Sequence, residues 1–209
     1  MDRFEFFDRI PAMPQAKRMR IHWAYDLAKR GHSGQLRDTG ERYFEHVRGV
    51  ANILIDHGYV KADDIILGIL HDILEDTTMM LSMLERLFGP EVAREIVSVS
   101  KTYGIEDPLT GFVIPSPALS KEQYFGKVLR NGKRAARAKC ADRIFNLRDL
   151  VKAHPPGSRW TPEKRLKQAE ETREWVIPLA EIADSRFVVV LTKLCDEIES
   201  DVRKTQTNA

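Results

Sequence analysis

The chain has 209 residues, of which 43% are hydrophobic and 31% charged, and its formal net charge at pH 7 is +2. This length suits one domain with a substantial core, and two cysteines are too few for a disulfide framework or a cysteine-based zinc site. No apolar run approaches the roughly 20 residues of a membrane span, and the acidic start MDRFEFFDRIPAMPQ does not resemble a signal peptide. We therefore expect a cytoplasmic protein without a membrane anchor.

Positive charge is concentrated in one segment of the chain. Residues 121–173 carry 15 Lys or Arg against 6 Asp or Glu, a balance of +9, and the remainder carries −7. A basic segment beside an acidic one suits a small polyphosphate ligand held next to a metal, although a solvated helical surface explains the charge equally well. The sequence contains no nucleic-acid recognition motif and does not indicate an oligomeric state.

Apolar residues recur at helical spacing along most of the chain, which predicts an all-α fold. Gly104, Gly111 and three prolines interrupt this pattern in segment 102–119, which we expect to be a functional or mobile loop with at most a small β-hairpin. We expect one domain with its core at about 16–180, a helical extension to about 203 and a disordered tail. The predicted helices are one ending at Gly31, then 43–57, 62–76 with Asp63 as N-cap, 79–88 capped by Thr77 or Thr78, one opening at Pro90, 120–129 opened by Ser120 and Gln123, 134–152, and one from 163 onward.

The stretch GILHDILEDT (68–77) places a histidine and three acids in an otherwise apolar helix. Burying unpaired carboxylates is costly, and negative charge near the C-terminal end of a helix is unfavourable. A divalent cation would offset both costs. His71 and Asp72 offer nitrogen and oxygen donors, which suit manganese, iron or zinc, and Glu75 and Asp76 follow on the same broad helix face.

Two further residues complete a candidate metal site. His46 lies in YFEH on the preceding predicted helix, and Asp142 interrupts an apolar-periodic stretch in ADRIFN. Two imidazoles and two carboxylates would leave positions open for water and a substrate phosphate. Taken singly, His46 could be a structural histidine, and Asp142 could form a buried ion pair with Arg143 or Arg148.

The chain resembles the HD-domain phosphohydrolases, whose signature is the residue order H…HD…D. The resemblance is strengthened by EDT after the HD pair, an upstream YxxH and a downstream ADRxxNxR. More narrowly, the chain resembles the hydrolase domain of the RelA/SpoT proteins, which remove the 3′-pyrophosphate from the alarmone ppGpp. The resemblance covers about residues 20–180. Its matching stretches are AYDLAKRGHSGQLRDTGERYFEH, ILHDILEDT, FGPEVAREIVSVSK, KCADRIFNLRDL and, more weakly, RLKQAEETREWVIPLA.

This resemblance implies an HD-domain helical bundle with Mn²⁺ as cofactor and a ppGpp-like nucleotide as substrate. Because 209 residues leave no room for the family's synthetase domain, it implies a stand-alone hydrolase. The implied metal ligands are His46, His71, Asp72 and Asp142. The implied catalytic residues, which position or deprotonate the attacking water and handle the leaving group, are Glu75 and Asp76. The implied substrate contacts are Arg37, Thr39, Tyr43, Asn146 and, more weakly, Lys101 and Arg148.

Four positions depart from the family pattern. Asp38 and Asp149 stand where a basic residue and threonine are usual, and Val47 and Phe145 replace a proline and a histidine. An added acid near a guanosine polyphosphate leaves a second reading open, in which the substrate is another phosphorylated nucleotide such as an adenosine alarmone or NADPH. A third reading, a non-catalytic nucleotide sensor, would be favoured by a lost metal ligand or catalytic acid, and none is lost.

Overall fold

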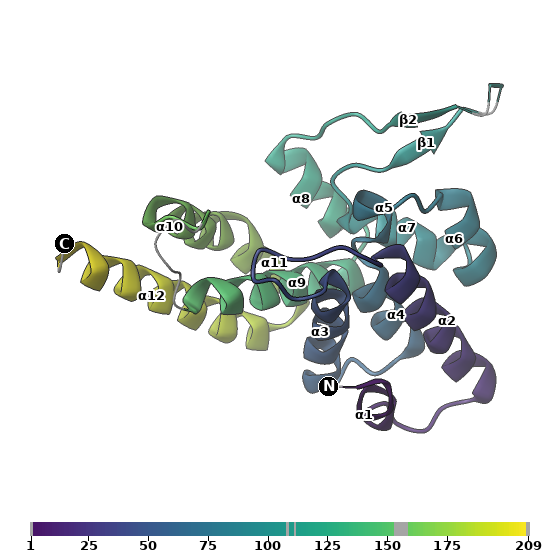
Figure 1. Ribbon diagram of the computed structural model, residues 1–209, viewed down its shortest axis with the longest axis horizontal. Coiled ribbons are helices and arrows are strands. Elements are labelled where there is room, and N and C mark those ends of the chain that lie inside the picture. The colour runs from purple at the N-terminus through teal and green to yellow at the C-terminus, as the bar shows by residue number, and fades with distance from the viewer. Residues whose placement is uncertain (1, 108, 111, 153–158, 208–209) are drawn as a thin grey trace.

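The computed structural model describes residues 2–107, 109–110, 112–152 and 159–207. The all-α expectation is confirmed, and a short two-stranded sheet accompanies the helices (Figure 1). In chain order the elements are α1 (Arg3–Asp8), α2 (Gln15–Gly31), α3 (Tyr43–Asp56), α4 (Ala62–Leu70), α5 (Ile73–Asp76), α6 (Leu81–Phe88), α7 (Pro90–Val99), β1 (Gly104–Glu106), β2 (Val113–Pro115), α8 (Lys121–Arg130), α9 (Lys133–Val151), α10 (Pro162–Glu171), the π-helical turn η1 (Thr172–Val176), α11 (Ile177–Ala183) and α12 (Ser185–Thr207).

Helix α9 lies between two groups of helices (Figure 1). Helices α3, α4 and α7 pack on one side of it, and α11 and α12 pack on the other. One hydrophobic cluster joins both groups and reaches from Phe6 in α1 to Ile198 in α12. The hydrophobic core therefore includes apolar side chains from both end helices.

Helix α4 explains the apolar run IILGIL. All of its residues except Asp63 are buried, so the helix is enclosed by its neighbours on every side. At Gly68, an added Cβ would lie 3.0 Å from the Cα of Ala51 and 2.9 Å from a methyl group of Leu54. Glycine at this position therefore allows α3 and α4 to approach closely, and that approach brings His46 and His71 to one side of the bundle.

The predicted helix 62–76 is interrupted at the His71–Asp72 pair. Helix α4 ends at Leu70, Asp72 has φ −101° and ψ 0°, and the short α5 begins at Ile73. The backbone N–H groups of Glu75 and Asp76 both donate to the Asp72 carbonyl, at 3.1 and 3.0 Å. The expectation of one continuous helix was wrong because the apolar spacing runs through the interruption without a change of pattern.

The expected helix ends have mixed outcomes. At the start of α8, Ser120 and Gln123 form the predicted capping box, and Gly89 with φ +86° separates α6 from Pro90 at the start of α7. The predicted side-chain caps of α4 and α6 were wrong: Lys61 and Met80 precede these helices, and neither makes a side-chain capping bond. Asp63 instead pairs with Arg20 at 2.8 Å, and Thr77 bonds the carbonyl of Ile73.

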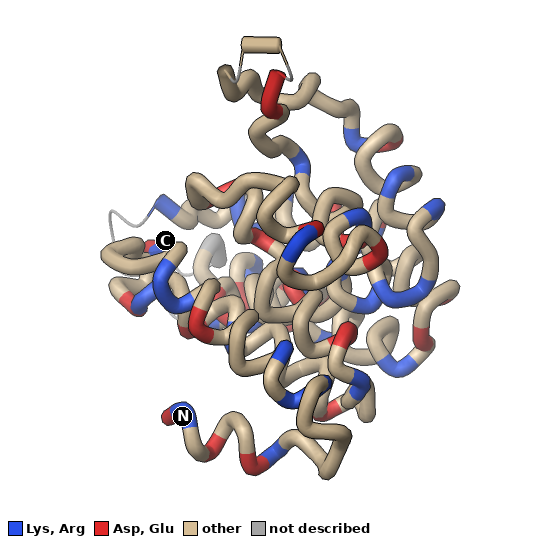
Figure 2. The backbone as a smooth tube through the Cα atoms, turned by 90° about the vertical axis from the view of Figure 1, so that its right-hand side faces the viewer, with Lys and Arg blue, Asp and Glu red and all other residues tan. Residues whose placement is uncertain are grey.

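The loop 102–119 contains the antiparallel pair β1–β2, in which Gly104 faces Pro115. This hairpin projects from the helices, as Figures 1 and 2 show. Helix α12 continues to Thr207, beyond the predicted end near 203, and residues 208–209 of the expected disordered tail lie outside the described part of the chain. Among the described residues, no helix is both long enough and apolar enough to cross a membrane.

Candidate active site

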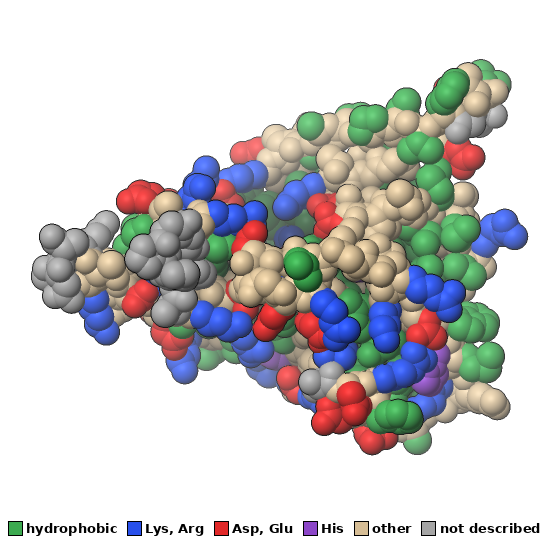
Figure 3. Space-filling model, in the orientation of Figure 1, with side chains coloured by type: hydrophobic (Ala, Val, Ile, Leu, Met, Phe, Trp, Pro, Cys, Tyr) green, Lys and Arg blue, Asp and Glu red, His purple; other side chains and the backbone are tan. Residues whose placement is uncertain are grey.

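A cavity of about 480 Å³ opens between the α3–α5 side of the bundle and helices α9 and α10. Figure 3 shows a hollow in this region with basic and acidic side chains side by side at its rim. Most of the predicted site residues line the cavity. Its lining residues are Leu36, Arg37, Asp38, Thr39, Tyr43, His46, Asp72, Glu75, Asp76, Lys101, Lys139, Asp142, Arg143, Asn146, Asp149, Leu150, Arg159, Trp160 and Gln168.

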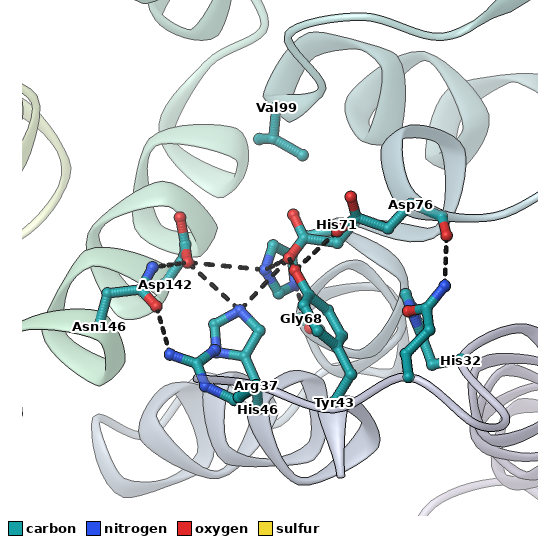
Figure 4. A network of polar contacts seen from close by, with 12 residues as sticks. His32, Arg37, Tyr43, His46, Gly68, His71, Asp76, Val99, Asp142 and Asn146 are labelled. Atoms are coloured by element: carbon teal, nitrogen blue, oxygen red, sulfur yellow. Dashed lines mark hydrogen bonds and ion pairs between the residues drawn. The ribbon is translucent and has the colours of Figure 1, made fainter. Parts of the chain in front are cut away.

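The structure brings the four predicted metal ligands together (Figure 4). His46, Asp72 and Asp142 line the floor of the cavity, whereas His71 is buried beside them and is not among the lining residues. His46 Nε2 lies 3.3 Å from Asp72 Oδ2 and 3.4 Å from Asp142 Oδ1. His71 Nε2 lies 3.1 Å from the same Asp72 oxygen and 3.8 Å from the same Asp142 oxygen. The donor atoms of His46, His71 and Asp142 all lie within 4.8 Å of one another, so these three residues can hold a metal ion, with Asp72 beside them.

The His71 imidazole is oriented as a metal ligand is. His71 Nδ1 lies 2.9 Å from the Gly68 carbonyl, which can only accept, so Nδ1 carries a proton and Nε2 is the atom that faces the cluster. A bound cation would take the place of the proton on Nε2. His71 Nε2 is buried and makes no hydrogen bond in spite of the nearby carboxylates. A buried polar nitrogen without a partner is rare in folded proteins, and a cation at this point would satisfy it. The residues present therefore fit a divalent metal ion.

Asp142 is held on both sides by its own helix. Its Oδ2 accepts a hydrogen bond from Lys139 at 2.7 Å, and its Oδ1, which faces the imidazoles, accepts one from Asn146 at 2.6 Å. The buried cation beside Asp142 is thus Lys139, not the Arg143 or Arg148 considered from the sequence. Since residues three and four positions apart share a helix face, α9 places all three groups at one wall.

Charges in the cluster compensate one another. Burial disfavours the imidazolium form, and it lowers the pKa of His46; at His71 the carboxylates of Asp72 and Asp142 outweigh burial and raise the pKa to about 10. Burial alone would raise the pKa of the two carboxyls. The charge of His71 at Asp72, and of Lys139 at Asp142, outweighs it and holds both pKa values well below their ordinary range. Both carboxyls are therefore ionised and available as ligands.

The acidic pair lies on α5, at the opposite wall from α9. Burial raises the pKa of Glu75, and its carboxylate accepts a hydrogen bond from the backbone N–H of Lys101. Asp76 is exposed, and its Oδ2 lies 2.7 Å from the hydroxyl of Tyr43, which also lies 2.7 Å from Asp72 Oδ2. Gln35 holds the same short helix from outside by donating to the Asp76 carbonyl at 2.5 Å. Tyr43 thus links a predicted metal ligand to a predicted catalytic acid.

Arg37 occupies the end of the cavity away from the acidic pair. Its Nη2 donates to Asn146 Oδ1 at 2.9 Å and to Asp149 Oδ2 at 3.0 Å, and its guanidinium lies over the Phe145 ring at 5.3 Å. Asp149 also accepts from Lys152 at 2.6 Å. The acid that departs from the family pattern at this position is therefore neutralised by two cations.

The second unusual acid is also paired. Asp38 forms an ion pair with Arg159, which precedes α10 and lines the same cavity. Thr39 and Lys101 line the cavity as predicted, but Arg148 is exposed and is not among the lining residues. Helix α9 directs Asp142, Asn146 and Asp149 inward, and position 148 falls on a different face.

Sequence reasoning missed several lining residues. Lys139 stands three residues before Asp142 in an alanine-rich stretch, so its cation in an apolar setting was a usable signal. Arg159, Trp160 and Gln168 reach the cavity only through the packing of α10 against α9, for which no local pattern exists.

Comparisons with known proteins agree with this arrangement. The family model of the HD domain matches residues 24–164, which include all four predicted metal ligands. The chain belongs to the HD domain family.

The resemblance to RelA/SpoT proteins is confirmed by its curated relatives, which include a GTP pyrophosphokinase rsh of Brucella ovis. It is 30% identical over 183 residues, which are 86% of this chain. A probable guanosine-3′,5′-bis(diphosphate) 3′-pyrophosphohydrolase of Synechocystis is 34% identical over 161 residues and 76% of this chain. The bifunctional (p)ppGpp synthase/hydrolase SpoT of Escherichia coli K12 is 32% identical over 173 residues, which are 80% of this chain.

These relatives are much longer than the HD-domain chain described above. The aligned segments cover 22%, 19% and 22% of the three proteins. Among solved structures, a metazoan ortholog of SpoT that hydrolyses ppGpp superposes with a TM-score of 0.69. The match covers 90% of this chain and 98% of that one at 23% sequence identity, which supports the fold.

Proposed function

We propose that this HD-domain protein is a metal-dependent phosphohydrolase that removes the 3′-pyrophosphate of ppGpp to give GDP and pyrophosphate. The observation that carries the proposal is the placement of three groups around one cavity. The buried His–Asp cluster forms the floor, Glu75 and Asp76 form one wall, and Arg37 with Asn146 lies at the far end. These three groups correspond to what the reaction needs: a bound cation, a water molecule that is held in position, and contacts that bind the nucleoside.

The proposed metal is Mn²⁺, held by His46, His71, Asp72 and Asp142. Two imidazoles and two carboxylates form a mixed nitrogen and oxygen donor set, which suits manganese better than calcium. Once bound, such a cation would supply charge neutralisation to the phosphoryl oxygens and acidify a water molecule.

Residues of the acidic pair would position the water and transfer the protons. In the reaction, a water oxygen bonds to the phosphorus that carries the ribose 3′ oxygen, the bond between that phosphorus and O3′ breaks, and O3′ takes up a proton. Glu75 is the proposed base, because burial raises its pKa and so makes its carboxylate a better proton acceptor. Asp76 is held by Tyr43 at the same wall, where it would orient the water or deliver the proton to O3′.

Basic residues suit the polyphosphate. Lys101, which follows α7, and Lys139 and Arg143, on α9, line the cavity. Their charge would hold the phosphate groups of the substrate, while Arg37 and Thr39 would lie against the guanine base. The alternative substrates, an adenosine alarmone or NADPH, were suggested by the charges of Asp38 and Asp149. Both acids are ion-paired, so neither charge argues against a guanosine polyphosphate.

The experiment is a comparison of ppGpp turnover by the full chain and two glutamate variants. Chelator-treated protein is assayed with and without Mn²⁺, and products are resolved by anion exchange. We expect Mn²⁺-dependent GDP and pyrophosphate, a large loss of kcat in Glu75→Gln, and unchanged kcat in Glu85→Gln, an exposed control on α6. Metal-loaded protein that leaves ppGpp intact and cleaves another nucleotide would establish the alternative. A chain that binds nucleotide and cleaves none would be a sensor.

A further inference from the structure

A continuous chain of hydrogen bonds joins the two ends of the cavity. It starts at Asp142, whose Oδ1 accepts from Asn146 Nδ2 at 2.6 Å. Asn146 Oδ1 in turn accepts from Arg37 Nη2 at 2.9 Å, and the same Nη2 reaches Asp149 Oδ2 at 3.0 Å. Asp142, Asn146 and Asp149 are spaced four and three residues apart and so share one face of α9. The candidate metal cluster and the nucleoside end are therefore built on one rigid helix.

Within this chain, the ion pair between Arg37 and Asp149 is largely shielded from water. The side chains are 14% and 9% exposed, whereas Lys152, the second partner of Asp149, is 58% exposed. A shielded pair loses little of its attraction to solvent screening, while an exposed lysine contributes little. Loss of Lys152 would leave Asp149 paired with Arg37, but loss of Asp149 would leave Arg37 without an ionic partner among the described residues.

Arg37 also has features of a fixed binding surface. One face of its guanidinium lies over the Phe145 ring at 5.3 Å, and its Nε is buried without a hydrogen-bond partner. An arginine side chain loses rotamer entropy when it is fixed, so an arginine that is held in place before the ligand arrives binds at a lower entropic cost.

We propose that Asp149 is a positioning residue that fixes Arg37, stacked on Phe145, as a flat platform for the nucleobase of the substrate. This inference rests on the proposed function, because it takes a nucleotide as the ligand. It explains why an acid can stand near a polyphosphate site: its charge is compensated by the shielded ion pair with Arg37, and its effect on the substrate passes through the arginine.

Kinetics with ppGpp and Mn²⁺ test the proposal. We expect Asp149→Asn to raise KM on the order of tenfold and leave kcat within about twofold, since the lost bond is a charged one away from the reacting phosphorus. Lys152→Met, which removes the other partner of the same carboxylate, is the matched control and should leave KM unchanged. The Arg37→Ala Asp149→Asn double variant should have the KM of Arg37→Ala alone. Unchanged KM in Asp149→Asn, or effects that multiply in the double variant, would overturn the proposal.

A second readout does not depend on ppGpp turnover. Phenylglyoxal modifies accessible arginines, and peptide mass spectrometry gives the rate at each site. We expect modification at Arg37 to be faster in Asp149→Asn than in the wild type and unchanged in Lys152→Met, with thermal unfolding confirming that each variant is folded. Faster labelling with no ppGpp hydrolysis by the wild type would retain the positioning role and reject the proposed function. Equal labelling in all three proteins would reject the positioning role.

Discussion

The Tyr43→Phe substitution removes the hydroxyl group that connects the candidate metal cluster to the acidic pair on α5. The Tyr43 hydroxyl lies 2.7 Å from both Asp72 Oδ2 and Asp76 Oδ2. The ring itself stacks on His32, with centroids 4.8 Å apart and an angle of 22° between the planes, and phenylalanine keeps this contact. The substitution therefore removes the bridge between the two carboxylates and retains the packing beneath the site.

The size of the effect follows from the number of bonds lost. A hydroxyl has one proton, so it donates fully to one carboxylate at a time, and a hydrogen bond to a charged group contributes about 1.5–3 kcal/mol. If Asp76 is held in place by this bond during the reaction, kcat should fall about 10- to 150-fold. KM for ppGpp should change little, because the hydroxyl faces the acids and not the nucleoside end of the cavity.

Steady-state ppGpp hydrolysis at saturating Mn²⁺ measures this effect, with bound metal quantified in the same samples. Tyr59→Phe is the matched control, since the Tyr59 hydroxyl also donates to a carboxylate, that of Asp184, outside the cavity. We expect the control to lower thermal stability and keep kcat. Wild-type kcat in Tyr43→Phe, or an equal loss of kcat in both variants, would refute the role given to the bridge.

Three further predictions concern the scaffold. Gly68→Ala should lower the free energy of unfolding by about 1–3 kcal/mol in urea titrations, because its Cβ would overlap α3, and an unchanged midpoint would contradict the close packing. Hydrogen bonds from Arg186 lower the pKa of Asp184 in the folded protein, so this carboxylate stabilises the fold above about pH 4 and loses that effect as the pH falls further. Asp184→Asn should thus be less stable than the wild type at pH 7, with the gap narrowing below pH 4; a constant gap would argue against the ion pair. Burial raises the pKa of the Cys195 thiol to about 11, and Cys140 is buried as well. We therefore expect neither thiol to react with a thiol reagent at pH 8 until the protein is unfolded. Rapid labelling of the native protein would contradict this expectation.

Local signals in the sequence were reliable where the structure they predict is also local. The capping box at Ser120 and the Gly89–Pro90 helix boundary depend on neighbouring residues alone, and both were predicted. The interruption at His71–Asp72 was missed, because Ile73 and Leu74 continue the apolar spacing and are buried as a continuous helix would bury them. Short α1 was not predicted either, although Asp2 and Glu5 form a capping box there.

The site could be predicted as a set of residues but not as a network. Charged side chains in apolar stretches, such as Asp72 and Asp142, are visible in the sequence because their burial is costly without a partner. The identity of those partners depends on tertiary packing. Asp149 illustrates the limit: the sequence presents it as an acid that would repel a phosphorylated substrate, and the structure pairs it with Arg37, more than a hundred positions earlier in the chain.

The most direct test of the central claim measures bound metal and ppGpp cleavage together. Chelator-treated protein is titrated with Mn²⁺, and each sample is divided between metal analysis and anion-exchange separation of its products. We expect GDP and pyrophosphate to form in proportion to bound Mn²⁺, and both signals to be lost in Asp72→Ala. Cleavage of ppGpp that persists without metal, or full Mn²⁺ binding by Asp72→Ala, would contradict the assignment of the His–Asp cluster as the catalytic metal site.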